Sequence, residues 1–125
     1  NNQGGVALPL SPQAVVNIAV QAAENRKALD VTVLDIREVS IIADYFVICS
    51  GRTGTQVQAI VENIQKELKD KGMLALRREG FREANWVLLD YGDVIIHVFQ
   101  GAEREFYNIE RLWGDARIVG VPVNI

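Results

Sequence analysis

Residues 86–99 read Trp-Val-Leu-Leu-Asp-Tyr-Gly-Asp-Val-Ile-Ile-His-Val-Phe, the clearest indication of β-structure in the sequence. Mainly apolar residues lie on both sides of a short turn at Tyr91-Gly92, and those after the turn are largely β-branched. Two such segments joined by two turn residues predict an antiparallel β-hairpin, with strands at 85–90 and 93–99. The chain is therefore expected to contain a β-sheet that includes this hairpin.

Alternation along the first hairpin strand divides its side chains between two faces. Trp86, Leu88 and Asp90 fall on one face, whereas Val87 and Leu89 fall on the other, which is expected to face the core. Tryptophan is over-represented among the residues that dominate protein interfaces, but aromatic residues also fill cores. From the residues alone, an interface role for Trp86 and a core role have equal weight.

Three further strands precede the hairpin in the sequence. The short segment 31–36 is rich in β-branched residues and 44–50 is mainly apolar, so both predict strands, and a third strand is expected at 74–78. The segment 44–50 is apolar on both faces, which is typical of a strand in the centre of a sheet. Residues 37–43 form the connection between the first two strands, and Ile41-Ile42 are expected to point inward.

Three segments predict helices. Ser11 can cap a helix over 12–27, because its hydroxyl oxygen accepts a backbone hydrogen bond and the following proline suits the first helical position. A second helix follows the turn at 51–55 and stops at Gly72, where cations precede the glycine. A third is expected at 103–113.

The order of these elements is α-β-β-α-β-β-β-α. This order predicts an α/β fold, with a mixed β-sheet of about five strands flanked by helices on at least one face. The length of 125 residues fits a single domain with its own hydrophobic core. Residues 1–11 are expected to form a flexible lead-in.

Composition limits the kinds of partner. The net charge of −3 and the absence of a run of basic residues disfavour extensive direct contact with nucleic acid. A mildly acidic domain is instead suited to docking on a basic protein. No apolar run reaches the ~20 residues that span a membrane, and residues 1–5 lack the features of a signal peptide. A cytoplasmic location is expected, or an organellar one if an address has been removed.

The turn at 50–55 lies between a strand and a helix, where backbone amides can bind a phosphate group. It lacks the lysine that a P-loop requires, so capping of the helix by Thr53 or Thr55 is favoured. Nucleotidyltransferases carry a similar Gly-Ser element followed by two metal-binding carboxylates one residue apart. No such pair follows here, because Asp90 and Asp93 flank the hairpin turn and are expected to shape it.

The remaining candidates for chemistry are single residues. His97 lies in a strand without a partner at catalytic spacing, so a structural, hydrogen-bonded histidine is favoured over a general base. Cys49 lies in an apolar strand, which favours an inert buried thiol over a nucleophile. We therefore expect no cofactor and no metal.

Four blocks of the sequence carry a family resemblance. They lie at 28–31, 43–51, 86–99 and 104–116. Their order and their residue sequences resemble those of the ribosomal silencing factor family, also called the Iojap family. The resemblance covers residues 12–117, nearly the whole domain. The lead-in at 1–11 and a C-terminal tail at 118–125 lie outside it.

The resemblance implies a nucleotidyltransferase-like fold without the catalytic carboxylates, in a protein that is not an enzyme. It implies a translation repressor that docks on the large ribosomal subunit through the universal large-subunit ribosomal protein fourteen. Bound there, the factor would block joining of the small subunit and lower translation under nutrient limitation. The resemblance also allows for a homodimer.

The docking surface of the family corresponds to the hairpin block in this sequence. By resemblance, the expected interface residues are Trp86, Leu88, Asp90 and Tyr91, followed by His97 and Tyr107. An alternative function, a nucleotide-binding protein or a nucleotidyltransferase-like enzyme, is supported by fold analogy and by the glycine-containing turn.

Overall fold

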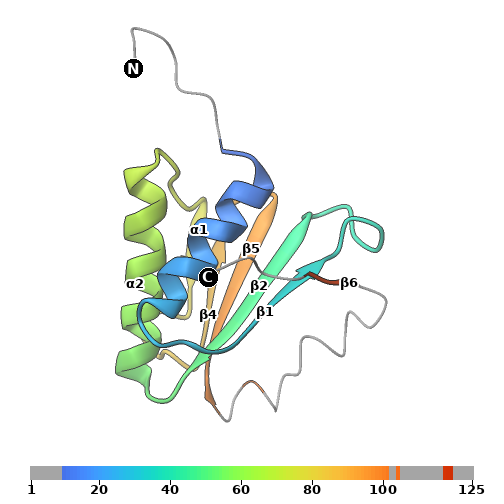
Figure 1. The fold of residues 1–125 in the computed structure, drawn as a ribbon. Coiled ribbons are helices and arrows are strands. Elements are labelled where there is room, and N and C mark those ends of the chain that lie inside the picture. Colours follow the sequence, from blue (N-terminus) through green and yellow to red (C-terminus); the bar gives the residue numbers. More distant parts are fainter. Residues whose placement is uncertain (1–9, 102–103, 105–116, 120–125) are drawn as a thin grey trace, which may run out of the picture.

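The computed structural model describes residues 10–101, 104 and 117–119, which form one mixed sheet and two helices (Figure 1). The helices are α1 (Pro12–Glu24) and α2 (Gly54–Asp70). The strands are β1 (Leu29–Asp35), β2 (Tyr45–Gly51), β3 (Arg77–Glu79), β4 (Trp86–Asp90), β5 (Val94–Gln100) and β6 (Arg117–Ile118). The expected α/β fold is confirmed.

The six strands lie in the order β3-β4-β5-β2-β1-β6. The central pair, β2 and β5, is parallel, and every other neighbouring pair is antiparallel. Every residue of β2 is buried, which confirms the prediction that this segment is central. The sequence does not predict β6, because two residues are too few to show alternation.

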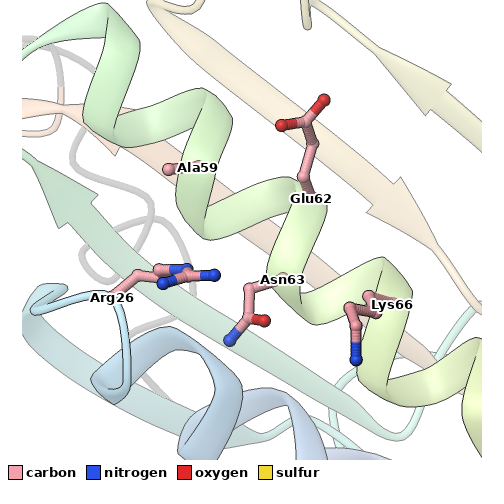
Figure 2. Close-up of a pocket in the computed structure, with 5 residues that line it drawn as sticks. All are labelled: Arg26, Ala59, Glu62, Asn63 and Lys66. Carbon is pink, nitrogen blue, oxygen red and sulfur yellow. The ribbon is translucent and has the colours of Figure 1, made fainter.

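Both described helices pack on the same face of the sheet and also against each other. The buried side chain of Asn63 on α2 donates a hydrogen bond to the carbonyl oxygen of Ala22 on α1 at 2.9 Å. Figure 2 shows the Asn63 side chain turned toward α1. This bond satisfies a buried amide where the helices meet. In the described ranges, no helix is long and apolar enough to cross a membrane.

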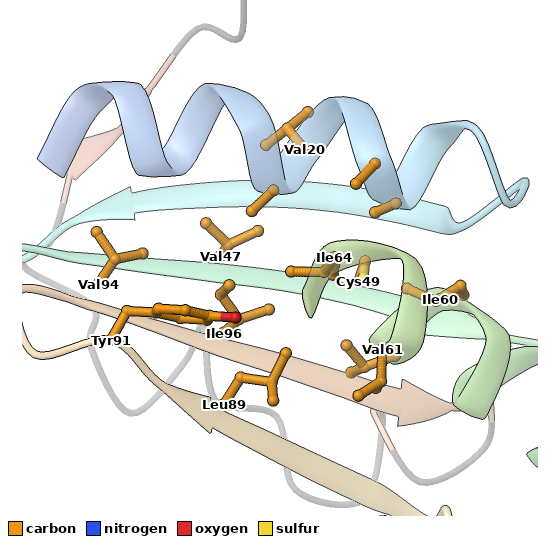
Figure 3. Close-up of a cluster of buried hydrophobic side chains, with 14 of the residues drawn as sticks. Val20, Val47, Cys49, Ile60, Val61, Ile64, Leu89, Tyr91, Val94 and Ile96 are labelled. Carbon is orange, nitrogen blue, oxygen red and sulfur yellow. The ribbon is translucent and has the colours of Figure 1, made fainter. Parts of the chain in front are cut away.

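The main hydrophobic core fills the space between the helices and the sheet (Figure 3). Ile60, Ile64 and Leu68 of α2 are fully buried there, at the helical spacing that the sequence shows. The sheet contributes alternate residues from its central strands, namely Val47, Cys49, Val87, Leu89, Val94, Ile96 and Val98. The predicted core side of β4, Val87 and Leu89, is thereby confirmed.

The ends of α1 follow local chemistry. The Ser11 side chain accepts a hydrogen bond from the backbone N–H of Ala14 at 3.2 Å, as a helix cap does. The helix ends at Glu24, three residues earlier than the predicted boundary at Lys27. Lys27 adopts a φ of 62°, and the backbone N–H of Ala28 returns to the carbonyl of Ala23, which closes the helix end.

The hairpin forms as predicted, but its tip lies one residue later than the sequence suggests. Asp90 pairs with Ile95, and the backbone N–H of Tyr91 donates to the carbonyl of Val94 at 2.9 Å. The two residues at the tip are therefore Gly92-Asp93, and Gly92 has the positive φ of 84° that this turn requires. Tyr91 continues the strand alternation and belongs to the face of Leu89.

The prediction that Ile41-Ile42 point inward is wrong. Ile41 is fully exposed and Ile42 largely so. Polar bonds fasten the connection at its base, because the Arg37 guanidinium binds Asp35 and the Ser40 hydroxyl accepts from the Ile42 backbone at 3.0 Å. The turn so fixed directs both isoleucines into solvent.

Two other boundaries differ from the expectation. The strand expected at 74–78 begins only at Arg77, and both Leu74 and Leu76 before it are exposed. The helix expected at 103–113 lies outside the described residues, apart from Arg104, which is helical. The Arg104 guanidinium donates to the carbonyl of Asp30 and to the Thr32 hydroxyl, so it fastens the first residues of β1.

Candidate functional site

The face of the sheet opposite the two helices carries a second apolar cluster, formed by Leu34, Ile36, Ala43, Phe46, Ile48 and Phe99. Trp86 of β4 packs at its margin. Its indole stacks on the ring of Phe99, the residue opposite in the β4–β5 register, with centroids 5.1 Å apart. Trp86 is half-buried, so part of the indole rests on the cluster and part faces solvent.

A buried histidine holds the indole in place. The Nε1–H of Trp86 donates a hydrogen bond to Nδ1 of His97 at 3.1 Å. His97 is only 4% exposed, and Phe46 meets its imidazole edge-on with centroids 4.7 Å apart. The expectation of a structural, hydrogen-bonded histidine is confirmed.

A small pocket opens beside Trp86. It has a volume of about 260 Å³ and is lined by Glu79, Gly80, Trp86 and Leu88. Gly80 has a φ of 80°, and a Cβ atom at this position would clash with the carbonyl oxygen of Trp86. A glycine is therefore required where the β3–β4 connection passes the pocket.

Charged side chains form the edge of this face. Arg77 donates from Nε to Asp90 at 3.1 Å and from Nη1 to Glu79 at 2.6 Å. The hydrogen bond to Asp90, followed by the charge of Glu79, raises the pKa of Arg77. The other carboxylate oxygen of Asp90 accepts from the Gly92 backbone at 2.8 Å, so the expected turn-forming role of Asp90 is confirmed.

The expected interface residues divide between two faces. Trp86, Leu88, Asp90 and His97 lie on the face of the sheet opposite α1 and α2, where the register places Leu88 opposite His97. Tyr91 is only 7% exposed and lies in the helix-side core, which follows from the later position of the hairpin tip (Figure 3). Burial raises the pKa of its phenol to about 12. Tyr107 lies outside the described residues.

The site also includes residues that the sequence pattern does not single out. Arg77, Glu79 and Gly80 reach Trp86 and Asp90 only because β3 pairs with β4 in antiparallel register. The signal that could have found them is Gly80 itself, a glycine six residues before the indole, between two strand-like segments. Strand pairing could not be read from the sequence around it.

The turn at 50–55 is a capped helix start. The Thr53 side chain accepts from the backbone N–H of Gln56 at 3.1 Å, and the Gln56 side chain accepts from the backbone N–H of Arg52 at 2.6 Å. The amide of Gln56 also donates to the carbonyl of Lys27 at 3.1 Å. The Thr53 hydroxyl thus caps the helix at the N–H of Gln56, and the prediction that a threonine caps it is confirmed for Thr53.

Replacing Thr53 with Ala is expected to lower the free energy of unfolding by about 1 kcal/mol, because the cap is lost. Urea denaturation followed by circular dichroism measures the change. Thr55→Ala is the matched control, since Thr55 is exposed inside the first turn and does not cap the helix. Equal losses in the two variants would contradict the assignment of the cap to Thr53.

A second pocket, of about 230 Å³, lies between the end of α1 and the middle of α2 (Figure 2). It is lined by Arg26, Ala59, Glu62, Asn63 and Lys66. Its charges are mixed, and the Asn63 amide is already bonded to α1. This pocket is a groove between packed helices, with side chains of the kind found on any solvated helix surface.

The remaining candidates for catalysis or metal binding are Cys49 and the acidic residues. Burial raises the pKa of the Cys49 thiol to about 12, because the thiolate would lose its hydration. The prediction that the Cys49 thiol is buried is confirmed. Across residues 10–101, 104 and 117–119, no three His, Cys, Asp or Glu side chains are grouped so that they could hold a metal ion.

Comparisons with known proteins agree with this architecture. The family model described as ribosomal silencing factor during starvation matches residues 9–124. The ribosomal silencing factor RsfS of Bacillus subtilis is 44% identical over 107 residues, which cover 86% of this chain and 91% of that protein. The chloroplastic protein Iojap of Zea mays is 30% identical over 102 residues, which cover 82% of this chain and 44% of that protein.

Solved structures give the same result. A crystal structure of a protein from Chromobacterium violaceum superposes with a TM-score of 0.82 at 31% identity. The superposition covers 92% of this chain and 95% of the other. The expected resemblance is confirmed in sequence and in fold, and the chain belongs to the ribosomal silencing factor family.

Proposed function

We propose that this protein represses translation by binding the large ribosomal subunit and sterically blocking the small subunit. Membership of the silencing factor family supports a regulatory role at the ribosome. The observation that carries the proposal is the half-buried indole of Trp86, which lies beside a pocket and is hydrogen-bonded to the buried His97. An aromatic side chain fixed in this way suits an interface anchor, because little conformational entropy is lost on binding.

The proposed partner is the universal large-subunit ribosomal protein fourteen. Trp86 and Leu88 would bury their remaining exposed apolar surface against it, since both line the pocket and both are half-buried. Asp90 would attract a lysine or arginine of the partner, although it already shares the guanidinium of Arg77. The net charge of −3 favours association with a basic protein.

The remaining expected interface residues receive different roles. We propose that His97 acts indirectly by orienting Trp86, because only 4% of its surface is exposed. Tyr91 would support the hairpin from the helix-side core. Tyr107 stays in the proposed interface on the family resemblance alone.

Blocking of this kind needs no bond to be made or broken. A bound domain of 125 residues would exclude the small subunit by its volume. The proposed function is therefore not enzymatic. The nucleotide-binding alternative gains no support in the described part of the chain, where the Thr53 hydroxyl oxygen is used for helix capping. The protein would act where ribosomes are, in the cytoplasm or in an organellar stroma or matrix.

Sucrose-gradient sedimentation with isolated ribosomal subunits tests the proposal. The protein should pellet with large subunits and not with small subunits. When it is added in excess before the subunits are mixed, the fraction of joined ribosomes should fall. Equal pelleting with both subunits, or undiminished joining in the presence of bound protein, would contradict the proposal.

Replacing His97 with Phe should weaken binding to large subunits about fivefold, the equivalent of about 1 kcal/mol, because the hydrogen bond to the indole is lost. The nitrogen-proton resonance of the Trp86 indole should shift in the free protein. Cys49→Ala, a buried change on the helix-covered face, is the control and should leave that resonance in place. An unchanged indole resonance in His97→Phe would refute the orienting role.

A further inference from the structure

Two leucines are exposed directly before β3. Leu74 is 68% and Leu76 is 73% exposed. Met73, which precedes them, and Ala75, which lies between them, pack partly against the main core. The segment is therefore extended, with its side chains alternating between the core and solvent. Large apolar side chains presented in this way commonly mark an interaction surface.

The segment is fastened at both ends. The backbone N–H of Met73 donates to the carbonyl of Leu68 at 2.9 Å, which closes the end of α2. The backbone N–H of Leu76 donates to the carbonyl of Asp90 at 2.7 Å. The leucines are thus held in place before any partner arrives, so binding them costs little ordering of the backbone.

The second of these bonds connects the leucines to the candidate site. A Cβ atom on Gly92 would lie 3.8 Å from Cδ1 of Leu76, so the leucine side chain rests beside the hairpin tip. Arg77, the next residue, binds the carboxylate of Asp90. The apolar surface of the leucines therefore begins where the charged edge of the Trp86 face ends.

The area that docking needs supports such an extension. A specific interface buries roughly 800 Å² on each partner and involves roughly 20–30 residues a side. The pocket at Trp86 is lined by four residues, which supply only a part of this area. The charges around the tip are mainly negative, because Arg77 faces the carboxylates of Glu79 and Asp90, and Asp93 is exposed beside them.

We propose that Leu74 and Leu76 extend the docking site around the hairpin tip and form its second anchor. The occupant is the same basic ribosomal protein of the large subunit that the proposed function places on Trp86, and the inference rests on that function. The partner surface that fits has an apolar patch for the two leucines, flanked by lysine or arginine side chains for the carboxylates.

The isoleucines of the β1–β2 connection provide a matched control. Ile42 is 66% exposed, close to the values of the two leucines, and Ile41 is fully exposed. They lie between β1 and β2, whereas the leucines precede β3, and β4 and β5 separate β3 from β2 in the sheet order. Removing either pair takes a similar apolar surface from the solvent-exposed part of the molecule.

The test compares the double variants Leu74→Ser/Leu76→Ser and Ile41→Ser/Ile42→Ser in sedimentation with isolated large subunits. The leucine variant should bind roughly tenfold more weakly, and the isoleucine variant should bind as the unaltered protein does. Both should keep the circular dichroism spectrum of the folded protein, since all four side chains are exposed. Trp86→Ala is measured alongside.

The outcomes separate the inference from the function on which it rests. If Trp86→Ala weakens binding and the leucine variant does not, the second anchor is refuted and the proposed function stands. An equal loss in the isoleucine variant would also refute it, because the effect would then be unspecific. If the unaltered protein fails to sediment with large subunits, the proposed function and the inference both fall.

Discussion

Replacing Trp86 with Ala is expected to weaken binding to isolated large subunits by about thirtyfold or more, the equivalent of about 2 kcal/mol or more. The change removes an indole that is stacked on Phe99, bonded to His97 and open to a pocket on its exposed side. Truncating such a residue loses its own contact area and also the shape of the pocket. Sedimentation over a range of protein concentrations measures the loss.

Two controls belong to this experiment. Trp86→Phe keeps a ring on Phe99 but has no N–H for His97, so its binding should fall between those of the unaltered protein and Trp86→Ala. Thermal unfolding must show that each variant is folded, since Trp86 also packs on the second core cluster. Undiminished sedimentation of folded Trp86→Ala would remove Trp86 from the interface.

Replacing Gly80 with Ala is expected to lower the free energy of unfolding by about 3 kcal/mol or more. A left-handed backbone costs a residue with a Cβ atom about 1–2 kcal/mol. At Gly80, whose φ is 80°, the new methyl group would also clash with the carbonyl oxygen of Trp86, so the backbone must shift. Urea denaturation measures the loss, which is a large part of the stability of an ordinary domain.

Gly72→Ala separates the two causes. Gly72 has a φ of 90°, but a Cβ atom there would have no neighbour within 4 Å. This variant should therefore show the backbone cost alone, about 1–2 kcal/mol. Equal losses of unfolding free energy in the Gly72 and Gly80 variants would contradict this prediction. They would show that the β3–β4 connection beside Trp86 accommodates a methyl group without strain.

The sequence predicts those parts of the fold in which local pattern and packing agree. The apolar spacing along α2 and the alternation of Val87 and Leu89 both describe side chains that face one continuous core. The hairpin was also predictable, because a glycine-containing turn between two apolar segments of strand length has few alternatives. The pattern does not fix the position of the tip, since either Tyr91-Gly92 or Gly92-Asp93 satisfies it.

This shift of the hairpin tip by one residue determines whether the Tyr91 side chain is buried or exposed. With the tip at Gly92-Asp93, strand alternation continues through Tyr91 and turns its side chain into the core. The exposure of Ile41 and Ile42 could not be predicted for a different reason. Hydrogen bonds of Arg37 and Ser40 set the direction of that turn, and composition alone favours burial of two isoleucines.

The candidate site was predictable in part. Trp86, Leu88 and Asp90 share a face by alternation within one strand, which the sequence shows directly. The bond from Trp86 to His97 depends on the β4–β5 register, and the positions of Arg77 and Glu79 depend on the pairing of β3. Contacts between strands follow from tertiary structure, so a pattern within one strand cannot reveal them.

The parallel pairing of β2 with β5 has a consequence for how the chain reaches its native state. Tyr45 pairs with Val94, so the two residues are 94 − 45 = 49 positions apart in the sequence. The middle of the sheet therefore cannot close until synthesis has passed β5, and closing so long a loop places the protein among slower, topology-limited folders. In a nascent chain that ends before β5, one edge of the apolar strand β2 is unpaired. Such a chain is at risk of aggregation until the remaining residues emerge.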